Sequence, residues 1–262
     1  MKKNENKNIF LLIIVIIILI LAAAALAMAL FLQFRDSDSS DSYTEYYETT
    51  NSSGSDTTEE TTEELSENPI DFEALQEENE DLYAWIEIPN TEINYVIAQA
   101  GDDNNDLFYL SHNMYKEYEF AGTIYSEKQN AKDFSDPVTV LYGHKMLNGS
   151  MFADLVNFKE EDFFDATPYF YIYTPGHILT YEIFAAYTYD NRHILNNFDF
   201  EDVNEFQSYL DYATDPSANN GNVREDVEIT TNDTIVVLST CANGGTDRYL
   251  VQGVLINDEK TK

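Results

Sequence analysis

Residue types that can carry nucleophilic chemistry lie at the ends of apolar, strand-like segments of the chain. Cys241, the single cysteine in 262 residues, follows the β-branched run at 234–239, and Arg248 opens the next apolar run, at 249–254. A short loop between antiparallel neighbours would bring the thiol and the guanidinium to one rim. A fixed positive charge there favours a thiolate and stabilises the oxyanion that forms when it attacks a carbonyl. The spacing predicts a cysteine nucleophile with an arginine clamp; the alternative is that Cys241 only packs and Arg248 is a solvated edge charge.

A cysteine nucleophile also needs a group that carries protons, and the chain has four histidines. His144 follows the apolar run at 138–142, so it too lies at a strand end. His112 lies in a loop-like segment, His177 in a Pro-Gly turn, and His193 after a long apolar run. Position alone favours His144 and leaves the other three as candidates.

Three separated blocks of sequence resemble motifs of the sortase family, and of class B sortases within it. They are WIEIPNTEINY at 85–95, YGHKM with NGSMF at 142–152, and LSTC at 238–241 followed by Arg248. The blocks occur in the family's order, and the resemblance covers residues 82–256. It implies that the chain is a cysteine transpeptidase, and no cofactor is expected.

The resemblance also implies a role for each matched residue. Cys241 would attack the carbonyl of a Thr in the C-terminal sorting signal of a secreted protein, NPxTx-like or LPxTx-like. His144 would protonate the leaving amine, and Arg248 would stabilise the oxyanion or position the substrate. An amine of the cell wall would then resolve the thioacyl-enzyme. Further candidate substrate contacts flank the thiol: Ser239, Thr240 and Asn243.

Two features depart from the class B pattern. Class B sortases usually place the Arg further from the Cys than the seven positions between Cys241 and Arg248. Asn243 stands where an acidic residue is often found two positions after the Cys. The shorter loop predicts a narrower groove on that side, and Asn243 means that no Cys-His-Asp triad is expected.

The pattern of short apolar runs predicts a mainly β domain at residues 69–262. About eight strands separated by turn signals favour a closed or nearly closed barrel. The family resemblance implies an eight-stranded sortase barrel with an N-terminal helix and one helix inserted between the sixth and seventh strands. A helix at 70–82 with Asp71 as N-cap, and an amphipathic helix with Val203, Phe206, Tyr209 and Leu210 on one face, suit these places. The expected strands are 84–88, 93–98, 122–125, 138–142, 169–173, 179–189, 234–239 and 249–256.

The segment before the domain predicts a membrane anchor and a spacer. Residues 9–32 are apolar, uncharged and long enough to cross a bilayer as a helix, and Lys2, Lys3 and Lys7 precede them. The positive-inside rule places residues 1–8 in the cytoplasm and the catalytic domain outside the cell. Residues 33–68 are rich in Ser, Thr, Asp and Glu and are expected to form a disordered spacer. The alternative is a cleaved signal peptide ending at Ala29, but the apolar run is longer than signal peptides usually have.

Composition narrows the range of partners. A formal net charge of −34, from 14 basic and 48 acidic side chains, argues against a nucleic-acid partner because phosphates would be repelled. The single cysteine excludes an intrachain disulfide. Asp102, Asp103 and Asp106 lack the spacing and the distal Glu of a calcium-binding EF-hand, so no metal site is predicted.

Competing functions stay open on the sequence alone. A pilin-polymerising sortase would join subunits through a lysine instead of a cell-wall amine. An L,D-transpeptidase is also a cysteine enzyme, but its Cys and Arg lie almost adjacent, unlike Cys241 and Arg248. The alternative outside enzymes is an acidic surface protein that binds cations or another ligand.

Overall fold

The structure is a computed structural model that describes residues 65–242 and 245–262. The expected membrane helix at 9–32 and nearly all of the spacer at 33–68 lie outside these residues, as does Asn243. Within the two described ranges, no helix has both the length and the apolar character to span a bilayer. The strands are β1 (Leu82–Glu87), β2 (Asn94–Gln99), β3 (Ile124–Ser126), β4 (Val138–Tyr142), β5 (Tyr169–Thr174), β6 (His177–Tyr189), β7 (Asn222–Val223), β8 (Ile235–Ala242) and β9 (Asp247–Lys260).

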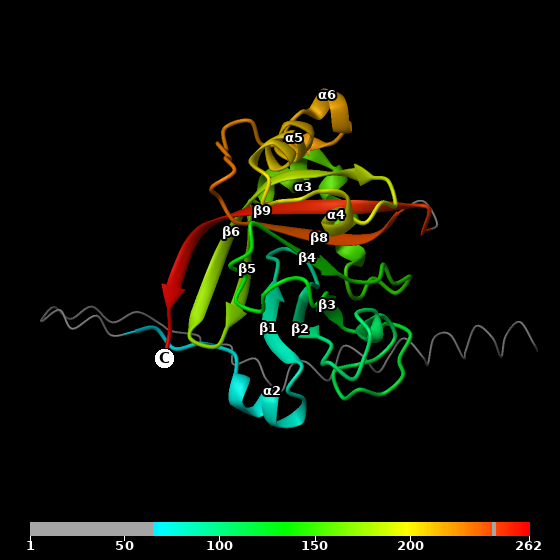
Figure 1. Ribbon diagram of the computed structural model, residues 1–262, viewed down its shortest axis with the longest axis vertical. Coiled ribbons are helices and arrows are strands. Elements are labelled where there is room, and N and C mark those ends of the chain that lie inside the picture. The colour runs from blue at the N-terminus through cyan, green and yellow to red at the C-terminus, as the bar shows by residue number, and fades with distance from the viewer. Residues whose placement is uncertain (1–64, 243–244) are drawn as a thin grey trace, which may run out of the picture. The chain divides into compact units, whose positions relative to one another are not determined.

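Eight of these strands close into a barrel (Figure 1). The hydrogen-bonded order is β5-β1-β2-β3-β4-β8-β9-β6, and β5 also pairs with β6, which closes the ring. The short β7 pairs with β6 outside this ring. Closure satisfies the backbone groups at both edges of the sheet. The predicted eight-stranded barrel is confirmed.

The strand bounds differ from the prediction mainly around the cysteine. β4 has the expected bounds, whereas β8 continues through Ala242 and β9 begins at Asp247. The extension follows from pairing, because Thr240 and Cys241 lie opposite Tyr249 and Arg248 in one antiparallel ladder. The cysteine therefore lies near the end of a strand, as predicted.

Strand β8 buries both of its faces. Val236 and Leu238 belong to a core cluster shared with β1, β2 and β5, whereas Ile235 and Val237 belong to a second cluster on the opposite face. This period of two is the expected alternation of side chains along a strand. Cys241 has the parity of the second cluster, so its side chain leaves the sheet on that face.

Helices complete the two core clusters. They are α2 (Phe72–Glu78), α3 (Glu161–Ala166), α4 (Ile194–Asn197), α5 (Val203–Ala213) and α6 (Pro216–Asn219), with 3₁₀ turns η2 (Phe108–Leu110) and η3 (Ala153–Lys159). Helix α2 lies beside β1, while α5 and α6 lie together at the opposite end of the barrel (Figure 1). Asp71 caps α2 as predicted, accepting a hydrogen bond from the amide of Ala74 at 3.0 Å. The helix ends at Glu78, earlier than expected, because Asn79 is extended and leads into β1.

Helix α5 is the inserted helix that the family resemblance implied, between the sixth and seventh strands of the barrel. Phe206, Tyr209 and Leu210 are buried in the second core cluster, as expected. Val203 is 62 % exposed, so its placement on the packed face was wrong. The reason is that the whole first turn of α5 faces solvent and the packed face begins at Phe206.

Candidate active site

Cys241 and Arg248 are direct partners across the antiparallel pair β8–β9. Directly opposed residues of neighbouring strands project from the same face of a sheet, a few ångströms apart. The loop between them is short because four residues, 243–246, connect the paired residues Ala242 and Asp247. The spacing of seven thus places Arg248 directly across from Cys241, and Nη1 of its guanidinium donates to the carbonyls of Gly245 at 3.3 Å and Asp247 at 3.1 Å. Cys241 is partly exposed, as an attacking thiol must be.

His144 is brought to the same region by the parallel pair β4–β8. Tyr142, the last residue of β4, lies opposite Ser239 of β8. The pairing continues past the strand, since the amide of Gly143 donates to the carbonyl of Ser239 at 3.1 Å. The hydroxyl of Thr240 donates to the carbonyl of Gly143 at 2.8 Å. The backbone on both sides of Gly143 is therefore fixed against β8 immediately before His144.

Two contacts hold the imidazole ring of His144. Its Nε2 lies 2.8 Å from the carbonyl oxygen of Leu110. A carbonyl only accepts hydrogen bonds, so Nε2 carries a proton and Nδ1 is the atom that can gain or lose one. Phe120 stacks on the ring, with centroids 5.2 Å apart and planes 16° from parallel. The ring is thus fixed in both tautomer and orientation.

One cavity of 310 Å³ contains all three predicted catalytic residues. Ser239 and Thr240, the candidate substrate contacts on β8, also line it. Its remaining walls are mostly apolar and aromatic: Leu107, Leu110, Tyr125, Tyr142, Tyr189 and Ile194. A concave site in which polar side chains converge between apolar and aromatic walls is typical of a binding site for a small ligand or peptide.

The cavity also holds a carboxylate–histidine pair that sequence reasoning missed. His193 Nε2 lies 2.8 Å from the carboxylate of Glu127, which is only 8 % exposed. The amide of Gln129 donates to the other oxygen of Glu127 at 2.7 Å. The pair fastens the segment after β6 to the end of β3. Glu127 stands in a polar stretch without a motif, so its role could not be read from sequence.

Two stacked tyrosines also line the cavity. The rings of Tyr125 and Tyr142 lie 5.4 Å apart. Burial raises the pKa of both phenols, the charge of Glu127 raises it further, and Arg248 opposes the shift. Both therefore stay neutral near pH 7 and present hydroxyl groups, not charges, to the cavity.

The two histidines outside this cavity have other partners. His112 is stacked on Phe108 with centroids 3.9 Å apart, and its Nδ1 lies 2.7 Å from the carbonyl of the same residue. His177 pairs with Asp258 at 2.6 Å between β6 and β9. The structure therefore places His144 and His193 near the cysteine and places His112 and His177 away from its cavity.

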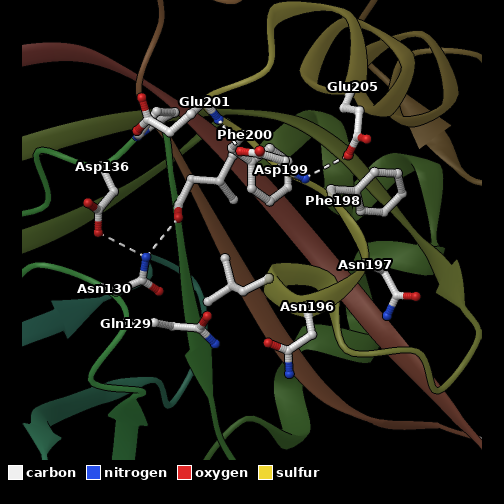
Figure 2. A pocket seen from close by; sticks show the side chains of 13 residues that line it. Gln129, Asn130, Asp136, Asn196, Asn197, Phe198, Asp199, Phe200, Glu201 and Glu205 are labelled. Carbon is white, nitrogen blue, oxygen red and sulfur yellow. Dashed lines mark hydrogen bonds between the residues drawn. The ribbon is translucent and has the colours of Figure 1, made fainter.

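A second cavity is larger, at 560 Å³, but has different chemistry (Figure 2). It lies between the segment after Glu127 and the segment leading into α5, and its lining includes Asp136, Glu201 and Glu205. Among the described residues that line it there is no cysteine, histidine or arginine. The larger volume of this cavity therefore does not mark it as the catalytic site.

Comparison with known proteins agrees with this geometry. Residues 86–256 match the sortase domain model. The chain belongs to the sortase family. It is 35 % identical to Sortase B of Listeria monocytogenes over 187 residues, which is 70 % of this chain and 72 % of that protein. Among solved structures, sortase B of Clostridium perfringens is similar, with TM-score 0.62 and 31 % identity over 71 % of this chain and 100 % of that one.

A substrate complex of Staphylococcus aureus sortase B is also similar, with TM-score 0.62 and 25 % identity over 71 % of this chain and 84 % of that one. The chain is therefore a class B sortase and a cysteine transpeptidase. This confirms the enzyme prediction over the alternative of a non-catalytic acidic surface protein. The predicted trio of this sortase meets in one cavity, whereas the contacts that hold His144, from Leu110 and Phe120, carried no sequence signal.

Proposed function

We propose that the chain cleaves a C-terminal sorting signal at a Thr, holds the protein as a thioacyl-enzyme on Cys241, and transfers it to an amine of the cell wall. The observation that carries this proposal is the meeting of Cys241, Arg248 and His144 in one cavity. The similar sortase B of Staphylococcus aureus, solved as a substrate complex, supports the binding of a substrate by this fold.

In the first step the Cys241 thiolate attacks the carbonyl carbon of the Thr. Arg248, directly opposite on β9, stabilises the oxyanion, which exists only after the attack. The C–N bond then breaks, and the departing nitrogen takes a proton from His144. Nδ1 is the donor in this proposal because Nε2 is bonded to the carbonyl of Leu110. The products are a thioester on Cys241 and a free amine.

In the second step an acceptor amine attacks the thioester. His144, now neutral, takes the proton that the amine loses, and the Cys241 thiolate leaves. The amide bond that forms replaces the one that was broken, so the reaction needs no external energy source. Thr240 has a positioning role here, because its hydroxyl is bonded to the carbonyl that precedes His144.

Residues 9–32 are proposed to anchor the enzyme, with the catalytic domain outside the cell. The basic residues before the apolar run, Lys2, Lys3 and Lys7, fit this orientation. An extracellular site would meet secreted proteins as substrates and cell-wall peptides as acceptors. A lysine of a pilin-type subunit is the alternative acceptor.

Quenched peptides with NPxTx-like and LPxTx-like motifs test the proposal when each is supplied with a cell-wall-type peptide amine or a lysine-bearing peptide. We expect cleavage after the Thr and a new amide bond to the cell-wall-type amine. Cys241→Ala should remove both activities and leave the fold unchanged, since Ala differs little in volume. Cleavage at the Thr by the Cys241→Ala variant would contradict the proposal.

A further inference from the structure

An apolar surface lies on two loops that flank His144. Among the described residues, nine large hydrophobic side chains are exposed, and five of them lie on these loops: Leu107, Tyr115, Tyr118, Phe120 and Leu147. Tyr118 is 74 % exposed, Phe120 46 %, and Leu147 fully exposed. We call these three residues the apolar collar. Exposed apolar patches of this kind mark interaction sites more often than chance.

The apolar collar lies next to the catalytic cavity at His144. Phe120 covers one face of the His144 ring but does not line the cavity, whereas His144 does. Leu147 lies three residues after His144, near the tip of a tight loop closed by the bridge between Lys145 and Met151. Leu107 lines the cavity and is also 54 % exposed, so an apolar side chain of these loops reaches the cavity itself.

The loop that carries Tyr118 and Phe120 is firmly held. Tyr118 packs edge-on against His112, which is stacked on Phe108. The hydroxyl of Thr123 donates to the carbonyl of His112 at 3.0 Å, and the amide of Glu119 donates to the carbonyl of Ser111. Tyr118 and Phe120 are therefore presented on a fixed framework and do not need to be ordered when a ligand binds.

Chemistry decides which part of a substrate meets this surface. A peptide that spans the scissile bond has its acyl part at Cys241 and Arg248 and its amino part at His144, because His144 protonates the departing nitrogen. The residues that follow the scissile bond must therefore pass His144 as they leave the cavity. Beyond His144 they meet Phe120, and then Tyr118 or Leu147.

We propose that the apolar collar binds apolar side chains in the substrate segment that follows the scissile bond, and so selects the leaving part of the sorting signal. This inference rests on the proposed function. It predicts that apolar residues in the leaving segment raise kcat/KM for acylation. A side chain the size of Leu in a pocket commonly changes this ratio by about tenfold or more, and a surface collar should give about tenfold.

The test uses two peptides with one cleavage motif, followed by two leucines or by two serines. Release of the C-terminal fragment gives kcat/KM for each peptide. The unmodified enzyme should prefer the leucine peptide about tenfold, and Tyr118→Ser with Leu147→Ser should reduce this preference to about onefold. Val203→Ser is the matched control, because Val203 is 62 % exposed on α5 and lies outside the collar. It should keep the full preference.

A thioester donor with the acyl part of the motif and no residues after it separates the two proposals. It should acylate Cys241 at equal rates in the unmodified enzyme and in the collar double variant. Failure to label Cys241 would overturn the proposed function. If both enzymes are labelled at equal rates, two results would overturn the collar proposal alone. One is that the unmodified enzyme shows no preference for the leucine peptide. The other is that the double variant keeps that preference. A preference for leucine that is seen only in the acceptor peptide would also overturn the collar proposal. So would a collar double variant that loses binding to lipid vesicles but keeps the peptide preference of the unmodified enzyme.

Discussion

At the scale of single residues, the catalytic chemistry depends on three side chains. Their residue types can be read from the sequence, but their alignment in the folded protein cannot. Cys241, Arg248 and His144 could be predicted because each lies at or near the end of an apolar segment and within a family motif. The contact that fixes the tautomer of His144 comes from the backbone carbonyl of Leu110. A carbonyl is present at every residue, so no residue type could have indicated it.

The guanidinium of Arg248 is expected to act through its shape as well as its charge. Arg248→Lys keeps the charge but replaces a planar fork of donors with a point charge on a flexible stem. We expect kcat/KM to fall by about 10²–10³-fold, as when an oxyanion donor is lost. Arg192→Lys is the control, since Arg192 lines the same cavity but is over half exposed and paired with Asp190 at 2.8 Å. Full activity of Arg248→Lys would show that the fork is not needed.

His144→Ala should remove the proton carrier and lower kcat/KM by about 10²–10⁴-fold. His112→Ala is the control because His112 packs between Phe108 and Tyr118 and does not line the cavity. Steady-state cleavage of one peptide by both variants checks the assignment. A comparable loss in His112→Ala, together with none in His144→Ala, would reverse it.

At the scale of elements, the site depends on β4 and β8 being parallel neighbours and β8 and β9 being antiparallel ones. The short loop between Cys241 and Arg248 predicted the antiparallel pair β8–β9, and the structure confirms it. The parallel pair β4–β8 could not be predicted, because apolar periodicity states which face of a strand is buried and not which strand lies beside it. The exposed first turn of α5 shows a related limit. The spacing of Val203 fits the apolar face of α5, yet the helix begins before it reaches the core.

At the scale of elements, Gly143 is the position where the smallest substitution should have the largest effect on stability and activity. A Cβ there would lie 2.5 Å from Ile124 Cδ1 and 2.7 Å from Phe152 Cδ2, and both side chains are fully buried. Gly143→Ala should lower the free energy of unfolding by about 1–3 kcal/mol through overpacking. It should also lower kcat/KM by about 10²-fold, because His144 is displaced.

The control for Gly143→Ala is Gly176→Ala. Gly176 has a φ of +83° in the turn between β5 and β6, and a Cβ there meets no atom within 4 Å. Its substitution costs backbone strain alone, about 1–2 kcal/mol, with no movement of His144. Denaturant unfolding and peptide kinetics on both variants separate stability from alignment. Equal activity losses in the two would mean that Gly143 acts only through stability.

At the scale of the whole molecule, the barrel and its inserted helix could be predicted from the sequence. The positions of cavities on the folded protein could not. Eight apolar runs and the family motifs predicted a closed barrel, and closure through β5–β6 confirms it. The structure adds the cavities, and the one that holds the catalytic residues is smaller than the one that lies beside the segment leading into α5. Cavities form where segments distant in sequence meet, so local patterns could not have placed them.

The proposed anchor leads to a prediction for the intact cell. Residues 9–32 should stay attached to the mature protein, and the spacer at 33–68 should be open to proteases because it is rich in polar and acidic residues. Treating intact cells with protease should release an active domain that begins within the spacer. N-terminal sequencing of the untreated protein is the control. A mature N-terminus near Leu30 would instead indicate signal-peptidase cleavage after Ala29.

The central claim is that Cys241 carries the cleaved substrate as a thioester. Intact-mass spectrometry of the enzyme, quenched in acid during turnover of a sorting-signal peptide without acceptor, tests it most directly. The account predicts a mass increase equal to the acyl fragment ending in Thr, located on Cys241 by fragmentation, and lost on adding an acceptor amine. It also predicts no increase in Cys241→Ala. An adduct on another residue, or peptide turnover by Cys241→Ala, would contradict it.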